Sequence, residues 1–225
     1  LASTSHIWDL VAPLLTENFR VIALDLRGHG ESAKPDSGYD FQTVATDLHR
    51  FINEIDLREP VLVGHSWGAD VVLVHGAIYD DSASGLVLVD GGFLELKGVP
   101  DLTLDKAKMV MAPPDFRGTG VEDFIGMIRS RSEDLNVTDG IAKIALANFE
   151  ISNDVILTAR LRRENHIQII EAFWNHQPAD LYSKITCPVL LMPTRQSGAK
   201  SAYSSLNFDK ERSIQLAGEL LPNSE

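Results

Sequence analysis

The 225-residue sequence is poor in cysteine, in basic residues and in long apolar runs, and each shortage excludes a class of protein. The single cysteine, Cys187, excludes an internal disulfide and a cysteine-rich zinc site. Lys and Arg number 20 against 32 Asp and Glu, so the net charge of -12 would repel nucleic acid and anionic membrane surfaces. No stretch reaches the roughly 18 unbroken apolar residues that a membrane span requires. We therefore expect no nucleic-acid partner and no membrane partner.

Hydrophobic residues make up 44% of the chain, which is enough for a substantial core. Four short aliphatic runs are apolar at successive positions, and this pattern predicts strands that are covered on both faces. Two amphipathic or apolar segments between these runs predict helices, the first of them capped by Asp40. Alternation of strand and helix predicts an α/β fold with a mostly parallel sheet flanked by helices. The predicted strands are 21–24, 61–63, 86–89 and 189–192, and the predicted helices are 41–55 and 67–79.

The region from residue 94 to residue 184 breaks this alternation and shows no comparable strand pattern. Its apolar spacing predicts helices over 119–132, 138–149 and 161–174, with Thr119 and Thr138 as N-caps. Such a helical region, inserted after the strand that ends near Asp90, would cover an edge of the sheet. The predicted domains are therefore 1–93 (core, first part), 94–184 (helical cap) and 185–225 (core, second part).

The sequence Gly64-His65-Ser66-Trp67-Gly68 lies between a predicted strand and a predicted helix. This is the G-x-S-x-G pattern of a nucleophile elbow, in which a sharp turn presents the serine at the carboxyl end of the sheet. Glycines are expected on both sides because side chains there would collide in so tight a turn. The N–H of Trp67 begins the next helix and is expected to stabilise an oxyanion beside Ser66.

Four segments in order make the chain resemble the α/β-hydrolase superfamily. They are RVIALDLRGHGESAKPD, PVLVGHSWGADVV, GLVLVDGG and CPVLLMP. The resemblance implies a Ser–acid–His hydrolase with Ser66 as nucleophile, a cap formed by the helical region, a small-molecule substrate, and no metal or other cofactor. Because the predicted nucleophile is serine and not aspartate, the sequence argues against membership of the haloalkane dehalogenase and epoxide hydrolase branches.

At both ends the family pattern is incomplete. The opening LASTSHIWDL resembles the segment that comes after a His-Gly pair in family members, so Leu1 would be the second oxyanion donor. The neighbouring strand would then precede Leu1, and the catalytic histidine is expected beyond Glu225. We therefore expect that the sequence is trimmed at both ends.

The acid of the triad also departs from the family pattern. Ser197 falls where relatives have an aspartate, so the resemblance points instead to Asp90 at the end of the preceding strand, where some relatives place the acid. Asp209 is the second choice, whereas Asp25 and Asp70 are interpreted as structural.

None of the seven histidines takes the place of the catalytic base. His166 and His176 lie in the predicted cap and are candidates to face the substrate pocket. The other five, among them His65 in the elbow, are interpreted as structural or solvated.

The predicted function is hydrolysis of a small or medium, mainly apolar carboxylic ester or lactone through an acyl-enzyme. Apolar side chains of the predicted cap favour such a pocket; they are Phe116, Phe124, Met127, Phe149, Phe173 and Trp174. Two alternatives stay open: a carbon–carbon bond or amide hydrolase of the same fold, and a receptor-like protein that binds ligand without turnover. The expected location is cytoplasmic, and the oligomeric state cannot be read from the sequence.

Overall fold

The computed structural model describes residues 1–131, 138–194 and 208–221. Within these ranges the chain forms two compact units. The first, which we call the sheet unit, comprises Leu1, residues 38–112 and the described residues from Ile167 onward. The second, the hairpin unit, comprises residues 2–37 and the described residues between Pro113 and His166. These units do not coincide with the predicted domains, whose boundaries after residues 93 and 184 stay a prediction.

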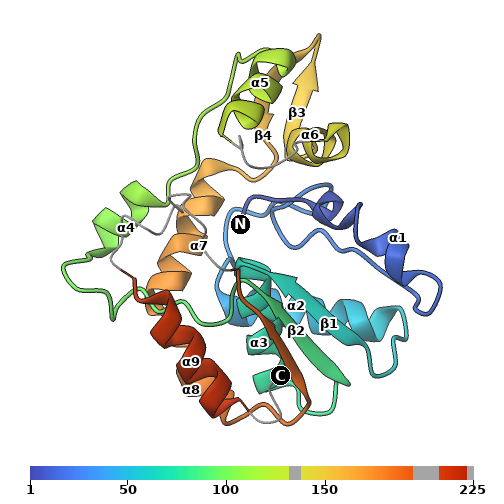
Figure 1. Ribbon diagram of the computed structural model, residues 1–225, viewed down its shortest axis with the longest axis vertical. Coiled ribbons are helices and arrows are strands. Elements are labelled where there is room, and N and C mark those ends of the chain that lie inside the picture. The colour runs from blue at the N-terminus through green and yellow to red at the C-terminus, as the bar shows by residue number, and fades with distance from the viewer. Residues whose placement is uncertain (132–137, 195–207, 222–225) are drawn as a thin grey trace. The chain divides into compact units, whose positions relative to one another are not determined.

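The sheet unit is built on three parallel strands in the order β1-β2-β5. Figure 1 labels the neighbouring strands β1 and β2. They are β1 (Val61–His65), β2 (Gly85–Val89) and β5 (Val189–Met192). His65, Val89 and Met192 are aligned across the sheet. The residues after them therefore emerge at one edge, and two of these residues are Ser66 and Asp90.

Two helices of the sheet unit match the predicted segments 41–55 and 67–79, whereas those over 104–110, 179–182 and 210–220 were not predicted. Asp40 caps α2 by accepting a 2.8 Å hydrogen bond from the N–H of Thr43, which confirms the predicted cap. The bounds are α2 (Phe41–Glu54), α3 (Trp67–Ile78), α4 (Leu104–Val110), α7 (Arg163–Asn175), α8 (Ala179–Tyr182) and α9 (Lys210–Leu220). Residues 163–166 of α7 group with the hairpin unit. Helix α3 packs on β1, on β2 and on α2, so it is central, as its nearly uniform apolarity predicted.

The core of the sheet unit lies between α3 and the strands. Leu73 of α3 and Leu88 of β2 are fully buried, and Tyr182 and Ile185 extend the cluster towards α8. Burial of such side chains contributes about 1.5–3 kcal/mol each. This packing holds the start of α3 against the ends of β1 and β2.

The hairpin unit contains two strands in a region where the sequence pattern predicted helices alone, so that prediction was wrong. β3 (Phe149–Ser152) and β4 (Val155–Ala159) form an antiparallel hairpin. Its loop residues Asn153 and Asp154 have φ of 48° and 58°, the left-handed pair of a type I′ turn. The unit also holds η1 (Ser5–Trp8), α1 (Ala12–Leu15), α5 (Val121–Arg131) and α6 (Asp139–Leu146).

Two further local predictions in this unit were wrong, and one was confirmed. Thr138 caps α6 by accepting from the N–H of Ile141, as predicted. Thr119 does not cap α5, because the helix begins at Val121 and the carbonyl of Gly120 accepts its first helical hydrogen bond, from the N–H of Phe124. Residues 21–24 form no strand, since no ladder partner lies beside them among the described residues.

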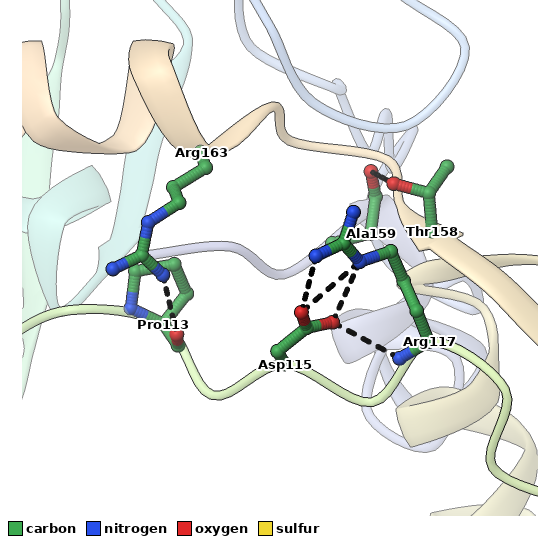
Figure 2. Close-up of polar contacts among 6 residues, drawn as sticks. All are labelled: Pro113, Asp115, Arg117, Thr158, Ala159 and Arg163. Carbon is green, nitrogen blue, oxygen red and sulfur yellow. Dashed lines mark hydrogen bonds and ion pairs between the residues drawn. The ribbon is translucent and has the colours of Figure 1, made fainter.

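The segment that leads into the hairpin unit is held by arginines (Figure 2). Arg163 donates to the carbonyl of Pro113 at 3.3 Å, and the guanidinium of Arg117 donates hydrogen bonds to both carboxylate oxygens of Asp115. Hydrogen bonds from Arg117 lower the pKa of Asp115 to about 2. These side chains are exposed, so the pairs fix local geometry more than they add stability.

Candidate active site

Ser66 occupies the junction between β1 and α3 in a strained backbone conformation. Its φ of 53° and ψ of -123° lie outside the regions that L-residues favour, at a cost of about 1–3 kcal/mol. The ladder supports this bend, because the N–H of Ser66 donates to the carbonyl of Val89 at 2.8 Å. The side chain is partly buried and makes no capping hydrogen bond to α3. The hydroxyl is therefore not used to terminate the helix.

Glycines make this bend possible, although not the pair that the sequence suggested. A Cβ on Gly64 would lie 2.2 Å from the carbonyl oxygen of Gly68, so the first glycine is required, as predicted. A Cβ on Gly68 meets no atom of the described residues within 4 Å, so the predicted collision there was wrong. Sequence reasoning missed Gly91, where a Cβ would lie 2.3 Å from the carbonyl oxygen of Ser66. The two consecutive glycines after β2, Gly91 and Gly92, were the sequence signal for this close approach.

The predicted oxyanion donors belong to the same unit as Ser66. Trp67 is the first residue of α3, and amides of a helix's first turn point out of its N-terminus. Leu1 groups with the sheet unit, although residues 2–37 group with the hairpin unit. Both roles stay predictions.

Asp90 lies next to Ser66 across the sheet, since its N–H donates to the carbonyl of Met192 and continues the ladder. Its Oδ1 accepts the Nζ of Lys210 at 2.5 Å and the N–H of Thr194 at 3.2 Å. Burial alone would raise the pKa of Asp90, but these hydrogen bonds outweigh burial and lower the pKa below its ordinary value. Asp90 is therefore held as a carboxylate.

Lys210 is a residue of the candidate site that sequence reasoning missed. It is the first residue of α9, its Nζ also donates to Thr194 Oγ1 at 2.9 Å, and it lies 5.9 Å from the centroid of the Phe93 ring. A separation of 120 positions from Asp90 leaves no local signal for the pair. The alternative acid, Asp209, caps α9 by accepting the N–H of Arg212. Ser197 lies outside the described residues.

Of the two acids interpreted as structural, one lies in each unit. In the hairpin unit, Asp25 accepts the N–H groups of Ser5 and Glu31. In the sheet unit, the buried carboxylate of Asp70 accepts the Nε2 of His176 at 3.1 Å. The sequence had not suggested that these two residues meet.

The other histidines have varied surroundings. Burial lowers the pKa of His65, while the nearby Asp90 acts in the opposite direction. Burial also lowers the pKa of His29 and of His75 to about 4. His166 is buried in the hairpin unit. Within the described ranges, no histidine side chain forms a hydrogen bond with Ser66, so the catalytic base stays unassigned.

Most of the aromatic rings that were expected to line a pocket pack against one another or against other buried rings. Phe116, Phe124 and Phe149 contact each other edge to face, with centroids 4.9–5.8 Å apart, and form a core of the hairpin unit. Phe173 is buried and meets Phe41 edge to face in the sheet unit. These rings account for four of the six predicted pocket residues.

Among the residues that the structure describes, no three His, Cys, Asp or Glu side chains are placed to share a metal ion. No helix in the same ranges combines the length and the apolarity needed to span a bilayer.

Comparisons with known proteins find curated relatives that match part of the chain. The chain is 37% identical to a soluble epoxide hydrolase of Corynebacterium sp. (strain C12) over 83 residues, which cover 37% of the chain and 29% of that relative. It is 34% identical to a 2-(acetamidomethylene)succinate hydrolase of Mesorhizobium japonicum over 90 residues, 40% of the chain and 32% of that relative. The matches therefore cover less than two thirds of either curated relative.

Solved structures match over nearly the whole chain, at identities that show the fold alone. An E-2-(acetamidomethylene)succinate hydrolase has a TM-score of 0.76 at 22% identity, covering 100% of this chain and 79% of the other. An esterase from Exiguobacterium antarcticum has a TM-score of 0.68 at 21% identity, covering 99% and 78%. The family model for the alpha/beta hydrolase fold matches residues 1–131, more than half of the 225. With its parallel sheet, flanking helices and strained serine turn, the chain belongs to the alpha/beta hydrolase fold family.

Proposed function

We propose that this protein is a serine hydrolase that cleaves a small or medium, mainly apolar carboxylic ester or lactone. The observation that carries the proposal is the strained turn at Ser66, with its hydroxyl unused by the helix and placed at the carboxyl end of the sheet. Strain of this kind persists where the surrounding structure enforces it, and it is often found at reactive residues. Relatives named as hydrolases support hydrolysis in general, although one of them is an epoxide hydrolase, and an esterase shares the fold.

In the proposed mechanism, Ser66 Oγ attacks the substrate carbonyl carbon and a histidine base takes the hydroxyl proton. The N–H groups of Trp67 and Leu1 bind the oxyanion that forms, each contributing about 3–4 kcal/mol. The leaving alcohol departs with the proton from the base, and water then releases the acid and regenerates Ser66.

Asp90 is proposed as the acid that orients this histidine. The Nζ of Lys210 and the N–H of Thr194 both bind Oδ1 of Asp90, and a carboxylate offers further acceptor positions on its other oxygen. The second oxygen can therefore accept an imidazole N–H while the first stays anchored. In this arrangement Lys210 fixes the carboxylate and keeps it ionised.

A fluorophosphonate probe tests the nucleophile. The wild-type protein should be modified at one residue, Ser66, and Ser66→Ala should be neither labelled nor active on p-nitrophenyl esters. Labelling at another serine, or equal ester turnover by both proteins, would contradict the proposal and favour the receptor-like alternative.

A pair of variants tests the acid. Asp90→Asn should lower kcat by several powers of ten, since loss of a triad acid costs about 10⁴-fold in a serine protease. Lys210→Met removes the anchor but leaves the carboxylate, so it should lower kcat far less. Equal losses in the two variants would assign Asp90 a purely structural role.

A second candidate function is amide hydrolysis on a small carboxylic acid. The likeness to a 2-(acetamidomethylene)succinate hydrolase, in sequence and in fold, favours it. An amide leaving group must be protonated as it departs, so this reaction uses the same nucleophile and base. Matched ester and amide substrates, with and without a free carboxylate, distinguish the two functions by their kcat/KM values.

A further inference from the structure

The hydrogen bond between Asp70 and His176 joins two distant segments of the sheet unit. Asp70 lies in the first turn of α3, four residues after Ser66, and His176 directly follows α7. The Nε2 of His176 is 3.1 Å from Oδ1 of Asp70, and the side chains are only 6% and 1% exposed. A carboxylate so deeply buried requires a partner, because an unpaired charge in the interior is strongly unfavourable.

Aromatic side chains hold His176 in place. The ring of Phe41 stacks on the imidazole with centroids 4.2 Å apart, and Phe173 meets it edge to face at 6.5 Å. On another side, His176 helps to line an open hollow of about 470 Å³ between the start of α2 and α7. The imidazole is thus fixed by packing as well as by its hydrogen bond.

Asp70 is close to the place where negative charge would develop during acyl transfer. Four helical residues span about 6 Å along the axis, so the backbone of Asp70 lies about one turn along α3 from Ser66, and helical side chains lean towards the N-terminus. A bare carboxylate there would oppose an oxyanion at Ser66. At an effective dielectric constant near 20, the repulsion of two unit charges 6 Å apart corresponds to a rate difference of about 100-fold.

We propose that His176 is a positioning residue that acts through Asp70: its N–H binds and offsets the carboxylate behind the elbow, so that the start of α3 can stabilise an oxyanion. This role rests on the proposed serine hydrolase function. It makes the reactivity of Ser66 depend on a residue that follows α7, outside the elbow and the strands.

The test is the rate at which the fluorophosphonate probe labels Ser66, measured at the same pH for all variants. His176→Phe keeps the aromatic packing but removes the donor, and should slow labelling by about 10- to 100-fold. Asp70→Asn removes the charge and should label within about threefold of wild type. The double variant should label faster than His176→Phe alone, because the repelling charge is gone.

A merely structural pair predicts the opposite, since removing both partners would leave labelling as slow as in His176→Phe or slower. That result, or wild-type labelling by His176→Phe, would overturn the inference. If His176→Phe does not fold, His176→Gln still supplies an amide donor, and it should label within about tenfold of wild type; slower labelling by a folded His176→Gln would also overturn it. Absence of Ser66 labelling in the wild type would instead refute the proposed function.

Discussion

Replacing Gly64 by alanine should destabilise the protein, whereas replacing Gly68 should not. A Cβ at Gly64 would lie 2.2 Å from the oxygen and 2.4 Å from the carbon of the Gly68 carbonyl, and 2.6 Å from the nitrogen of Ala69. All three atoms are backbone, so no side-chain rotation can relieve the contact. The strand end and the first turn of α3 would have to separate until these distances exceed 3.0 Å.

The magnitude depends on how much packing this separation disrupts. Overpacking a buried site typically costs about 1–3 kcal/mol, and rigid backbone on both sides places Gly64→Ala at the upper end. Alanine also restricts the unfolded chain, which returns about 0.5–1 kcal/mol. We therefore expect a net loss of about 2 kcal/mol, equivalent to a Tm lower by roughly 4–8 °C in a chain of this size.

Gly68→Ala is the matched variant on the other side of the serine. Its Cβ meets no described atom within 4 Å, and alanine is the better helix former by about 1 kcal/mol. The Tm should be unchanged or higher, as for Gly218→Ala in α9, where the Cβ also meets no described atom. Thermal unfolding followed by circular dichroism compares the three variants with wild type. Equal Tm values for Gly64→Ala and Gly68→Ala would refute the steric reasoning.

Three further predictions concern stability. Burial lowers the pKa of His75 to about 4 from its ordinary 6.5, so the folded state binds fewer protons than the unfolded state between these pH values. The free energy of unfolding should therefore be greatest above about pH 6.5 and fall by about 3 kcal/mol as the pH drops to 4. His75→Gln should lose this part of the pH dependence in urea unfolding, and an unchanged slope would contradict the assignment. Asp40→Ala removes the cap of α2 and should cost about 1 kcal/mol, whereas Asp40→Asn, which keeps an acceptor, should cost much less in the same assay. Asp154→Gly should raise the Tm slightly because glycine adopts the positive φ of the hairpin turn without strain, and a lower Tm would show that the aspartate side chain is needed.

The sheet and its elbow could be predicted because their signals are local. The aliphatic strands, the Asp40 cap and the glycine-flanked serine each occupy a few consecutive residues, and the structure places them as expected. Residues 21–24 have the same aliphatic pattern but form no strand. A strand also needs a hydrogen-bonded neighbouring strand, and the β propensity of a segment does not show whether one is present.

Contacts between distant segments could not be predicted from one sequence. Nothing near Asp90 indicates Lys210, and nothing near Asp70 indicates His176, because each pair is created only when separate elements pack together. The β3–β4 hairpin is a different case. Its Asn153-Asp154 turn was a readable signal, but the surrounding helical periodicity dominated the interpretation.

The unusual bend at position 66 belongs to the main chain. It is maintained by the close approach of Gly64 and Gly91 to their neighbours and by the ladder bond to Val89, none of which involves the serine hydroxyl. A thiol or a carboxylate introduced at this position would be displayed at the same edge of the sheet. The scaffold therefore fixes where the side chain of residue 66 is presented independently of its chemical identity, so a substitution there can change the group on display while the architecture persists.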